Sequence, residues 1–258
     1  MKVLILGATG NLGIRLIPAL LSRNLSVIAF VRSSSKLSSL LPPAIFKQIT
    51  VVEGDAKYVD SVKSAIVDHD CDAVVNTAGV AALMPWNSSD LPEIVGTVVK
   101  AAKEVHQLRQ KPLRVWILGG MGLMDVPGTN SMFFRFVPIF HEHLKDLALL
   151  KTIPSTVIRW SILCPSRMIP RSTEFVVPVK DSPSGGLAAS ATVPPHWQDF
   201  WFRRIPFVGS FFVVLANASR YNTALEDNAA FIADDLVMGS DEFVCEKVGV
   251  WDPAQGKV

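Results

Sequence analysis

The sequence predicts a doubly wound α/β fold, in which helices cover both faces of a parallel sheet. Three observations point to it. Over roughly the first 165 residues, short apolar or β-branched runs alternate with amphipathic stretches, as in successive βαβ units. A glycine-rich turn joins the first apolar run to the first amphipathic stretch. The chain has 258 residues, of which 49% are hydrophobic, enough to bury a core and too many for a disordered chain.

The elements can be justified in chain order. Lys2–Leu6 is an almost unbroken apolar run, typical of a strand that is buried on both faces. From Asn11–Ser22 the apolar residues recur with helical spacing. Strands two and three are expected at Leu25–Val31 and Ile49–Val52, where β-branched residues gather. A helix is expected next, with Asp60 or Ser61 as its N-cap ahead of the apolar Val62.

The same alternation continues to a sixth strand. Asp72–Asn76 and Leu113–Leu118 are short apolar strands on either side of Leu91–Leu108, a helix with one apolar face. A long helix over Phe140–Lys151 and a strand over Thr156–Leu163 complete the pattern. Six strands with such crossovers place a ligand at the carboxyl edge of the sheet, near the first and fourth strands.

After Pro165 the composition changes. Prolines and small residues crowd Pro178–Pro195, which predicts a loop, and Thr223–Met238 predicts a final helix. We therefore divide the chain into a Rossmann-type domain over residues 1–165 and a C-terminal segment over residues 166–258. The C-terminal segment is too short and irregular for a domain of its own, and we expect it to pack on the first domain and shape a ligand site.

Composition excludes several classes of function. A formal net charge of +2 gives no sign of nucleic-acid binding. Three separated cysteines without a CxxC pair suit a reducing compartment, and the first residues are expected to form a strand and not a leader. We therefore expect a cytoplasmic protein. We expect it to be a monomer or a weak homodimer. The apolar stretch Ile205–Ala216 is shorter than the roughly 20 residues of a transmembrane segment. It predicts a lid or a core segment, with shallow membrane contact as the alternative.

The strongest motif is the turn after the first strand, where Gly7, Gly10 and Gly13 form G-x-x-G-x-x-G. The first glycine allows a tight turn, the second a close approach of backbone to a pyrophosphate, and the third the packing of helix on strand. The N-terminus of the helix then faces the anion with free N–H groups. The motif predicts dinucleotide binding by the first domain, with these further contact residues in the turn: Thr9, Asn11 and Leu12.

The end of the second strand indicates which dinucleotide is bound. A preference for NAD usually comes with an acidic residue there, whereas this chain has Arg32 and Lys36 among three serines. The forked guanidinium suits a 2′-phosphate, so the cofactor expected is NADPH, although both cations could simply be solvated. Small and polar residues after the third and fourth strands would line the same cofactor: Asp55, Ala56, Thr77, Ala78 and Gly79.

These segments resemble an atypical short-chain dehydrogenase/reductase of the NAD(P)H-binding, NmrA-like and flavin-reductase-like kind. GATGNLG, FVRSSSKL, GDAKYVDSV and DAVVNTAG stand in the order typical of that family, and the later stretch DLALLKTIPSTVIRWSILCP is similar to its helix, turn and sixth strand. The resemblance implies a Rossmann fold and nucleotide-dependent chemistry, and it names no substrate.

The chain departs from the family in its catalytic set. The resemblance implies a Ser or Thr after the fifth strand and a Tyr-x-x-x-Lys on the next helix, but the strand runs into Gly119 and Gly120, and the helix carries His141 and Lys145 at that spacing. Positions four apart share a helix face. We expect His141 as proton donor and Lys145 beside the nicotinamide ribose; the alternative is a structural histidine. No metal is expected, because His141 and His143 diverge on a helix.

The expected substrate is a hydrophobic small molecule, because aromatic residues and methionines gather in segments that converge at the carboxyl edge. The residues expected to line its site, unless they are plain core, are Met84, Trp86, Met121, Trp160, Trp197 and Trp201. The leading hypothesis is an NADPH-dependent reductase of a hydrophobic carbonyl, enone or quinone-like acceptor. The alternatives are a non-catalytic NADP(H)-binding regulator and a non-redox isomerase or cyclase.

Overall fold

The computed structural model describes residues 1–79, 89–172, 186–206 and 208–254. Its main sheet has eight strands in the order β3-β2-β1-β4-β5-β6-β10-β8, and all neighbours are parallel except β10 and β8. The strands are β1 (Lys2–Leu6), β2 (Ser26–Val31), β3 (Thr50–Glu53), β4 (Ala73–Asn76), β5 (Leu113–Leu118), β6 (Ile158–Cys164), β8 (Ala188–Ala191) and β10 (Glu246–Trp251). The predicted doubly wound fold is confirmed.

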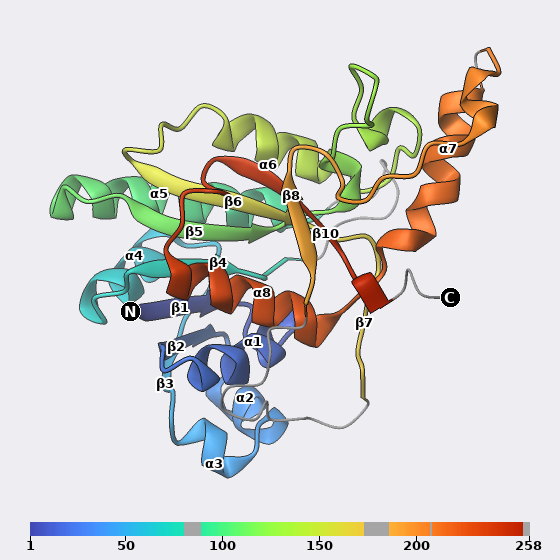
Figure 1. Ribbon diagram of the computed structural model, residues 1–258. Helices are drawn as coiled ribbons and strands as arrows, with labels where there is room; N and C mark the ends of the chain where they lie inside the picture. Colours follow the sequence, from blue (N-terminus) through green and yellow to red (C-terminus); the bar gives the residue numbers. More distant parts are fainter. Residues whose placement is uncertain (80–88, 173–185, 207, 255–258) are drawn as a thin grey trace.

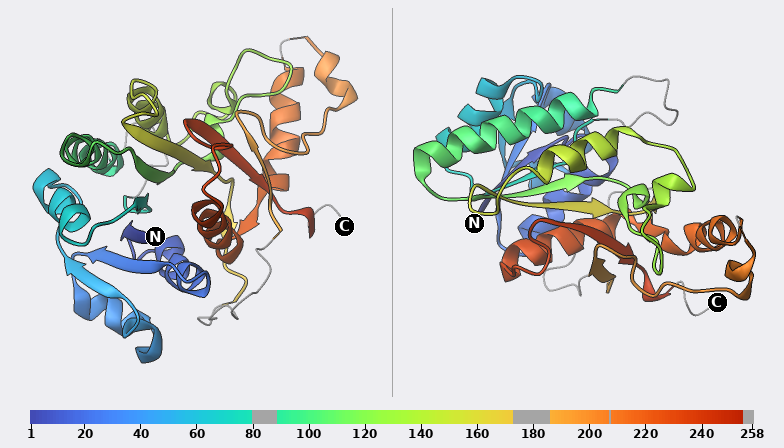
Figure 2. Two further views of the ribbon diagram at one scale, coloured as in Figure 1. Left: turned by 60° about the vertical axis from the view of Figure 1, so that its left-hand side comes forward. Right: turned by 90° about the horizontal axis from the view of Figure 1, so that it is seen from above.

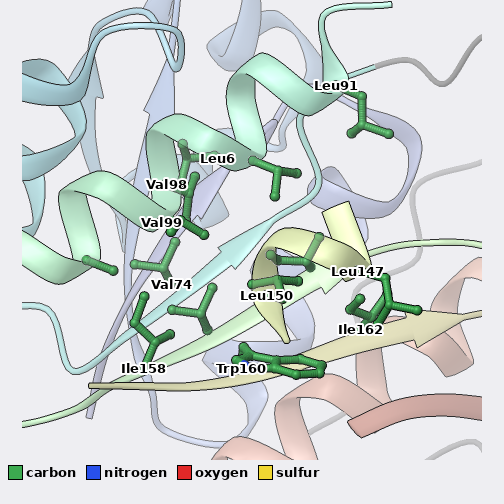
Figure 3. Packing of buried hydrophobic residues seen from close by; sticks show 14 of the residues in the cluster. Leu6, Val74, Leu91, Val98, Val99, Leu147, Leu150, Ile158, Trp160 and Ile162 are labelled. Atoms are coloured by element: carbon green, nitrogen blue, oxygen red, sulfur yellow. The ribbon is translucent and has the colours of Figure 1, made fainter. Parts of the chain in front are cut away.

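Helices cover both faces of the sheet (Figures 1 and 2). One face packs against α4 (Val59–Asp68), α5 (Leu91–Arg109) and α6 (Glu142–Leu150), and the other against α1 (Asn11–Ser22) and α8 (Leu225–Met238). Two shorter helices, α2 (Ser34–Leu40) and α3 (Pro43–Phe46), connect β2 to β3. Figure 3 shows the core on the α5 and α6 side, to which Val98 and Val99 of α5, Leu147 and Leu150 of α6 and Trp160 of β6 all contribute.

Most predicted elements end within two residues of the observed ones. The helix expected over Phe140–Lys151 begins only at Glu142, because Phe140 has a left-handed backbone with φ of 57° that an α-helix cannot include. The N-cap predicted at Asp60 or Ser61 is wrong, because the helix begins at Val59 with Tyr58 as its N-cap and Asp60 lies in its first turn. The final helix loses Thr223 and Ala224, which form the short strand β9 and pair with β7 (Met168–Ile169).

The C-terminal segment belongs to the same sheet. The loop predicted over Pro178–Pro195 is wrong at Ala188–Ala191, which forms β8, and its residues 178–185 lie outside the described part. The strand β10 lies beside β6, and β8 pairs with β10 on its outer side, so the two strands extend the sheet from six strands to eight. Segment 166–258 therefore contributes both sheet and surface elements to one architecture.

The C-terminal segment also fixes the loop that follows β5. Lys247 of β10 is buried, and its Nζ lies 2.7 Å from Oδ1 of Asp125. The backbone N–H of Asp125 donates to the carbonyl of Thr192 at 2.9 Å, and Arg203 donates to the carbonyl of Pro127. The conformation of residues 125–127 is thus fixed by three separate parts of the C-terminal segment.

Candidate functional site

The turn after β1 has the geometry that a phosphate-binding turn needs. Gly7 has φ of +83°, and an ideal Cβ there would lie 2.6 Å from the backbone nitrogen of Ala78. At Gly13 a Cβ would lie 2.2 Å from the carbonyl oxygen of Gly7. The N–H of Gly10 closes the turn on that same oxygen at 2.8 Å. Side chains are therefore excluded from the junction where strand, turn and helix meet.

The N-terminus of α1 is available to an anion. Gly10 is the N-cap, no side chain bonds to the cap, and the first turn of the helix carries no acidic residue. Nearby Arg15 is already paired, because its Nε lies 2.6 Å from Oε1 of Glu226 on α8. Burial raises the pKa of Glu226, but hydrogen bonds from Arg171 and Arg15 outweigh it and the net shift is downward. Backbone N–H groups, and not a free cation, are what this end of α1 offers a pyrophosphate.

The end of β2 places the predicted cations in solvent. Arg32 and Lys36 are exposed, and the hydroxyl of Ser33 caps α2 by accepting from the N–H of Lys36 at 3.2 Å. The sequence reasoning missed Glu53 at the end of β3, whose Oε1 accepts from the N–H of Ser34 at 2.6 Å. An acidic side chain from the neighbouring strand thus binds the backbone two residues after Arg32.

The turns after β3 and β4 also lie at the carboxyl edge of the main sheet. The N–H of Gly54 donates to Val31 at 2.9 Å, which sets Asp55 and Ala56 beside the end of β2. Thr77 donates its hydroxyl to the carbonyl of Leu6 at 2.9 Å. The turn from Thr77 to Gly79 is held further by the buried Asn76, whose Oδ1 accepts from Ala78 at 3.1 Å. It therefore lies directly against the glycine turn of β1.

A cavity of about 530 Å³ opens on the other side of this turn. Its volume falls within the range of small-molecule sites. The ends of β4, β5 and β6 form its floor, through Thr77–Gly79, Leu118–Gly122 and Pro165–Met168. The rest of the wall is mostly apolar and consists of Leu91, Phe133, Phe134, Val137, Ile139, Phe140, His143 and Ala218. The cavity lies where the sequence places a ligand, next to the phosphate turn at the carboxyl edge.

One imidazole borders this cavity. His143 of α6 is buried, and its Nδ1 lies 3.6 Å from Oδ2 of the equally buried Asp146. Among the residues that the structure describes, neither of these two atoms has a hydrogen-bond partner. An ideal Cβ on Gly120 would be 3.7 Å from His143 Nε2, an ordinary contact distance, so the ring lies directly against the backbone of Gly120. With Nδ1 directed at the carboxylate, Nε2 is the nitrogen that remains for a ligand.

The pair predicted from sequence lies elsewhere on the helix. His141 is the N-cap residue of α6, its Nε2 lies 2.9 Å from the carbonyl of Pro138, and it is absent from the cavity lining. Lys145 is exposed and is also absent from the lining. The face of α6 that meets the cavity is instead the one shared by His143, Leu147 and Leu150. That face was visible in the sequence as an apolar i, i+4, i+7 pattern that includes His143.

The structure separates the residues expected to line the substrate site. Met121 lines the cavity, whereas Trp160 is 2% exposed in the middle of β6 and belongs to the core. Trp197 packs edge-on against Phe133 with ring centroids 5.4 Å apart, one layer behind the cavity wall. Trp201 is 81% exposed, on the far side of the C-terminal segment. Met84 and Trp86 lie outside the described residues.

The thiols of Cys71 and Cys164 are buried, and burial makes them unreactive. Burial raises the pKa of both Cys71 and Cys164 to about 12. At pH 8 roughly one such thiol in ten thousand is a thiolate, the form that reacts. Iodoacetamide at pH 8 should therefore leave both residues unmodified in the native protein and alkylate them only in denaturant, as read by peptide mass spectrometry. The half-buried Cys245 is the internal comparison, and early modification of Cys164 would contradict this assignment.

Comparison with known proteins now decides the family. Residues 7–192, more than half of the chain, match the NAD(P)H-binding family. The chain belongs to this family. The resemblance to NmrA-like and flavin-reductase-like proteins is thereby confirmed, and the glycine turn from Gly7 to Gly13 lies at the start of the matched region.

Solved structures of the same fold agree with this family. A Streptococcus pneumoniae protein provisionally named an NADH-flavin reductase superposes with a TM-score of 0.59 at 17% identity, covering 98% of this chain and 99% of that one. A Veillonella parvula short-chain dehydrogenase/reductase in complex with NADP gives a TM-score of 0.60 at 16% identity, covering 98% and 95%. At these identities the likeness shows the fold alone.

One curated relative matches part of the chain. An Arabidopsis thaliana protein named "Epimerase family protein SDR39U1 homolog, chloroplastic" is 30% identical over 108 residues, which are 42% of this chain and 29% of the relative. The chain thus matches less than a third of the length of that relative.

Proposed function

We propose that this protein is an NADPH-dependent reductase of a hydrophobic carbonyl, enone or quinone-like small molecule. The observation that carries the proposal is the apolar cavity, which has the phosphate turn beside it on one side and the imidazole of His143 in its wall. The residues fit the cofactor, because the turn excludes every Cβ at Gly7 and Gly13 and leaves the N-terminus of α1 uncapped. When bound, the nicotinamide supplies a hydride.

The chain's own groups have distinct roles in this proposal. The N–H groups at the start of α1 bind the pyrophosphate, with Thr9, Gly10 and Asn11 at the turn. The aromatic wall, including Phe133 and Phe134, binds the acceptor and excludes water. His143 donates a proton from Nε2 to the acceptor oxygen as that oxygen gains negative charge, and Asp146 orients the ring through Nδ1. His143 thus takes the role first assigned to His141.

We further propose that Arg32, with Lys36, selects NADPH over NADH. Both side chains are exposed at the end of β2, where an NAD-specific chain usually carries an acid. Arg32→Asp should weaken NADPH binding at least tenfold and NADH binding by less than about twofold. Calorimetric titration with both nucleotides measures the two affinities.

Two further variants sharpen this test. Glu53→Gln removes a carboxylate beside Ser34, so NADPH should bind the variant more tightly. Lys47→Asp makes the same change of charge as Arg32→Asp at an exposed position on α3's C-cap, and it should leave both affinities unchanged. Equal losses of NADPH and NADH in Arg32→Asp would contradict the assignment of the 2′-phosphate.

The activity itself is tested by the loss of NADPH absorbance with a panel of apolar aldehydes, enones and quinones. Oxidation of NADPH by one of these acceptors is the expected result. Tight nucleotide binding with no oxidation would favour the regulator, and conversion of substrate without added nucleotide would favour an isomerase.

A further inference from the structure

The segment from Trp201 to Ala218 presents apolar side chains to solvent. It consists of a short 3₁₀ helix over Trp201–Arg204 and the helix α7 (Gly209–Ala218), and we call it the apolar hairpin. Among the described residues, it contains six of the fifteen large hydrophobic side chains that are exposed. The six are Trp201, Ile205, Val208, Phe211, Phe212 and Leu215, with exposed fractions from 40% to 81%.

The hairpin is anchored to the body by its other face. Val213 and Val214 of α7 are buried, and the side chain of Asn217 donates to the carbonyl of Gln198 at 2.8 Å. Arg203 binds the carbonyl of Pro127 and lies 2.7 Å from a carboxylate oxygen of Asp199. In Figures 1 and 2 the helix projects from the rest of the molecule at one end. The exposed face therefore belongs to a docked element and points away from the body.

The charged side chains within this segment are all arginines, and one of them, Arg203, is paired with the flanking Asp199. From residue 200 to residue 221 the sequence contains Arg203, Arg204 and Arg220 and no Asp or Glu. Arg204 is exposed, and within the described parts of the chain it forms no ion pair. Aromatic and aliphatic side chains with arginines at their border are the composition of elements that insert into the surface of a bilayer.

The length of the helix limits how it could meet a bilayer. In the ranges that the structure covers, no helix combines the length and apolar character needed to cross a membrane. The helix α7 has only 10 residues, about half of a membrane-spanning helix. Contact would therefore be limited to the interface.

We propose that the apolar hairpin docks on an anionic lipid surface. Phe211, Phe212 and Leu215 enter the boundary of the acyl chains, while Trp201 and Arg204 remain at the level of the headgroups. Arg204, which has no carboxylate partner among the described residues, favours this occupant over a second copy of the chain, because the hairpin itself offers no Asp or Glu to pair with it across a two-fold contact. The proposal does not depend on the reductase activity.

The test is flotation of the purified protein with vesicles of phosphatidylcholine alone and of phosphatidylcholine mixed with phosphatidylserine. We expect binding to the mixed vesicles and a blue shift of tryptophan emission that Trp201→Phe removes. The double substitution of Phe212→Ser and Leu215→Ser should lower partition at least tenfold. Arg204→Gln should lower it about fivefold on the mixed vesicles only.

Controls come from exposed apolar residues elsewhere on the surface. Leu108→Ser and Met238→Ser change side chains that are 68% and 74% exposed, and partition should not respond to them. The proposal is overturned if the protein stays unbound on both vesicles, or if the hairpin variants partition as the parent does. It is equally overturned if light scattering shows a dimer that the Phe212 and Leu215 double variant loses, since the hairpin would then be covered by a second copy.

Discussion

Gly10→Asp should abolish nucleotide binding while the protein keeps its fold. Gly10 has φ of −83° and ψ of 170°, a conformation open to any residue, and it occupies the N-cap of α1. Aspartate is among the best N-cap residues, so the variant should be at least as stable as the parent. The same carboxylate satisfies the N–H groups that would bind the pyrophosphate and repels its charge. We expect affinity for NADPH to fall by at least about 100-fold.

Calorimetry and thermal unfolding together check this result. Gly10→Ala is the matched control: its Cβ would lie 3.2 Å from the oxygen of Gly7, a close contact without charge, and the loss of affinity should be much smaller. Undiminished NADPH binding by Gly10→Asp would show that the pyrophosphate does not lie on α1. A variant that binds poorly because it has unfolded would be recognised by its lowered Tm.

The second large effect is expected at His143. Replacing it with Gln keeps a polar side chain of similar size and removes the proton donor, so the rate of acceptor reduction should fall by about 100-fold or more. Nucleotide affinity should be unchanged, because His143 lies in the wall of the cavity and not at the glycine turn. Single-turnover loss of NADPH absorbance measures the rate, and calorimetry measures the affinity.

His141 supplies the matched control on the same helix. His141→Gln should retain the parental rate, because its ring is bonded to Pro138 outside the cavity. Asp146→Asn should act through the orientation of His143, with a smaller loss of rate and an altered pH profile. If His141→Gln slows the reaction and His143→Gln does not, the assignment first made from the spacing of His141 and Lys145 is restored.

The fold was predictable from the sequence wherever one local rule decided the structure. Val3 to Leu6 can only be a strand buried on both faces, and the glycine spacing fixes how it turns into α1. The strand β10 could not be predicted in this way. It begins with Glu246 and Lys247, and the buried charge of Lys247 is tolerated only because Asp125, 122 residues earlier, lies 2.7 Å away.

The nucleotide side of the candidate site was more predictable than the acceptor side. The glycine turn from Gly7 to Gly13 is one continuous motif. The cavity wall, in contrast, is assembled from the ends of three strands, α6 and the start of β7. Which histidine faces the cavity, His141 or His143, depends on where the helix begins and so on which side each residue points. The left-handed backbone of Phe140 shifts that start to Glu142. Glu53 was missed because it reaches the end of β2 from the adjacent strand β3.

The contacts between the C-terminal segment and the loop after β5 have a consequence for the evolution of such a protein. Asp125 and Pro127 follow directly on Met121, a residue of the cavity wall, and they are held by Lys247, Arg203 and the backbone of Thr192. Within the described residues, none of the hydrogen bonds or ion pairs of these three residues involves the glycine turn of β1. Substitutions at these three positions can therefore reshape the cavity wall while the glycine turn is inherited unchanged, so proteins that share this turn can diverge in the small molecule that the cavity accepts.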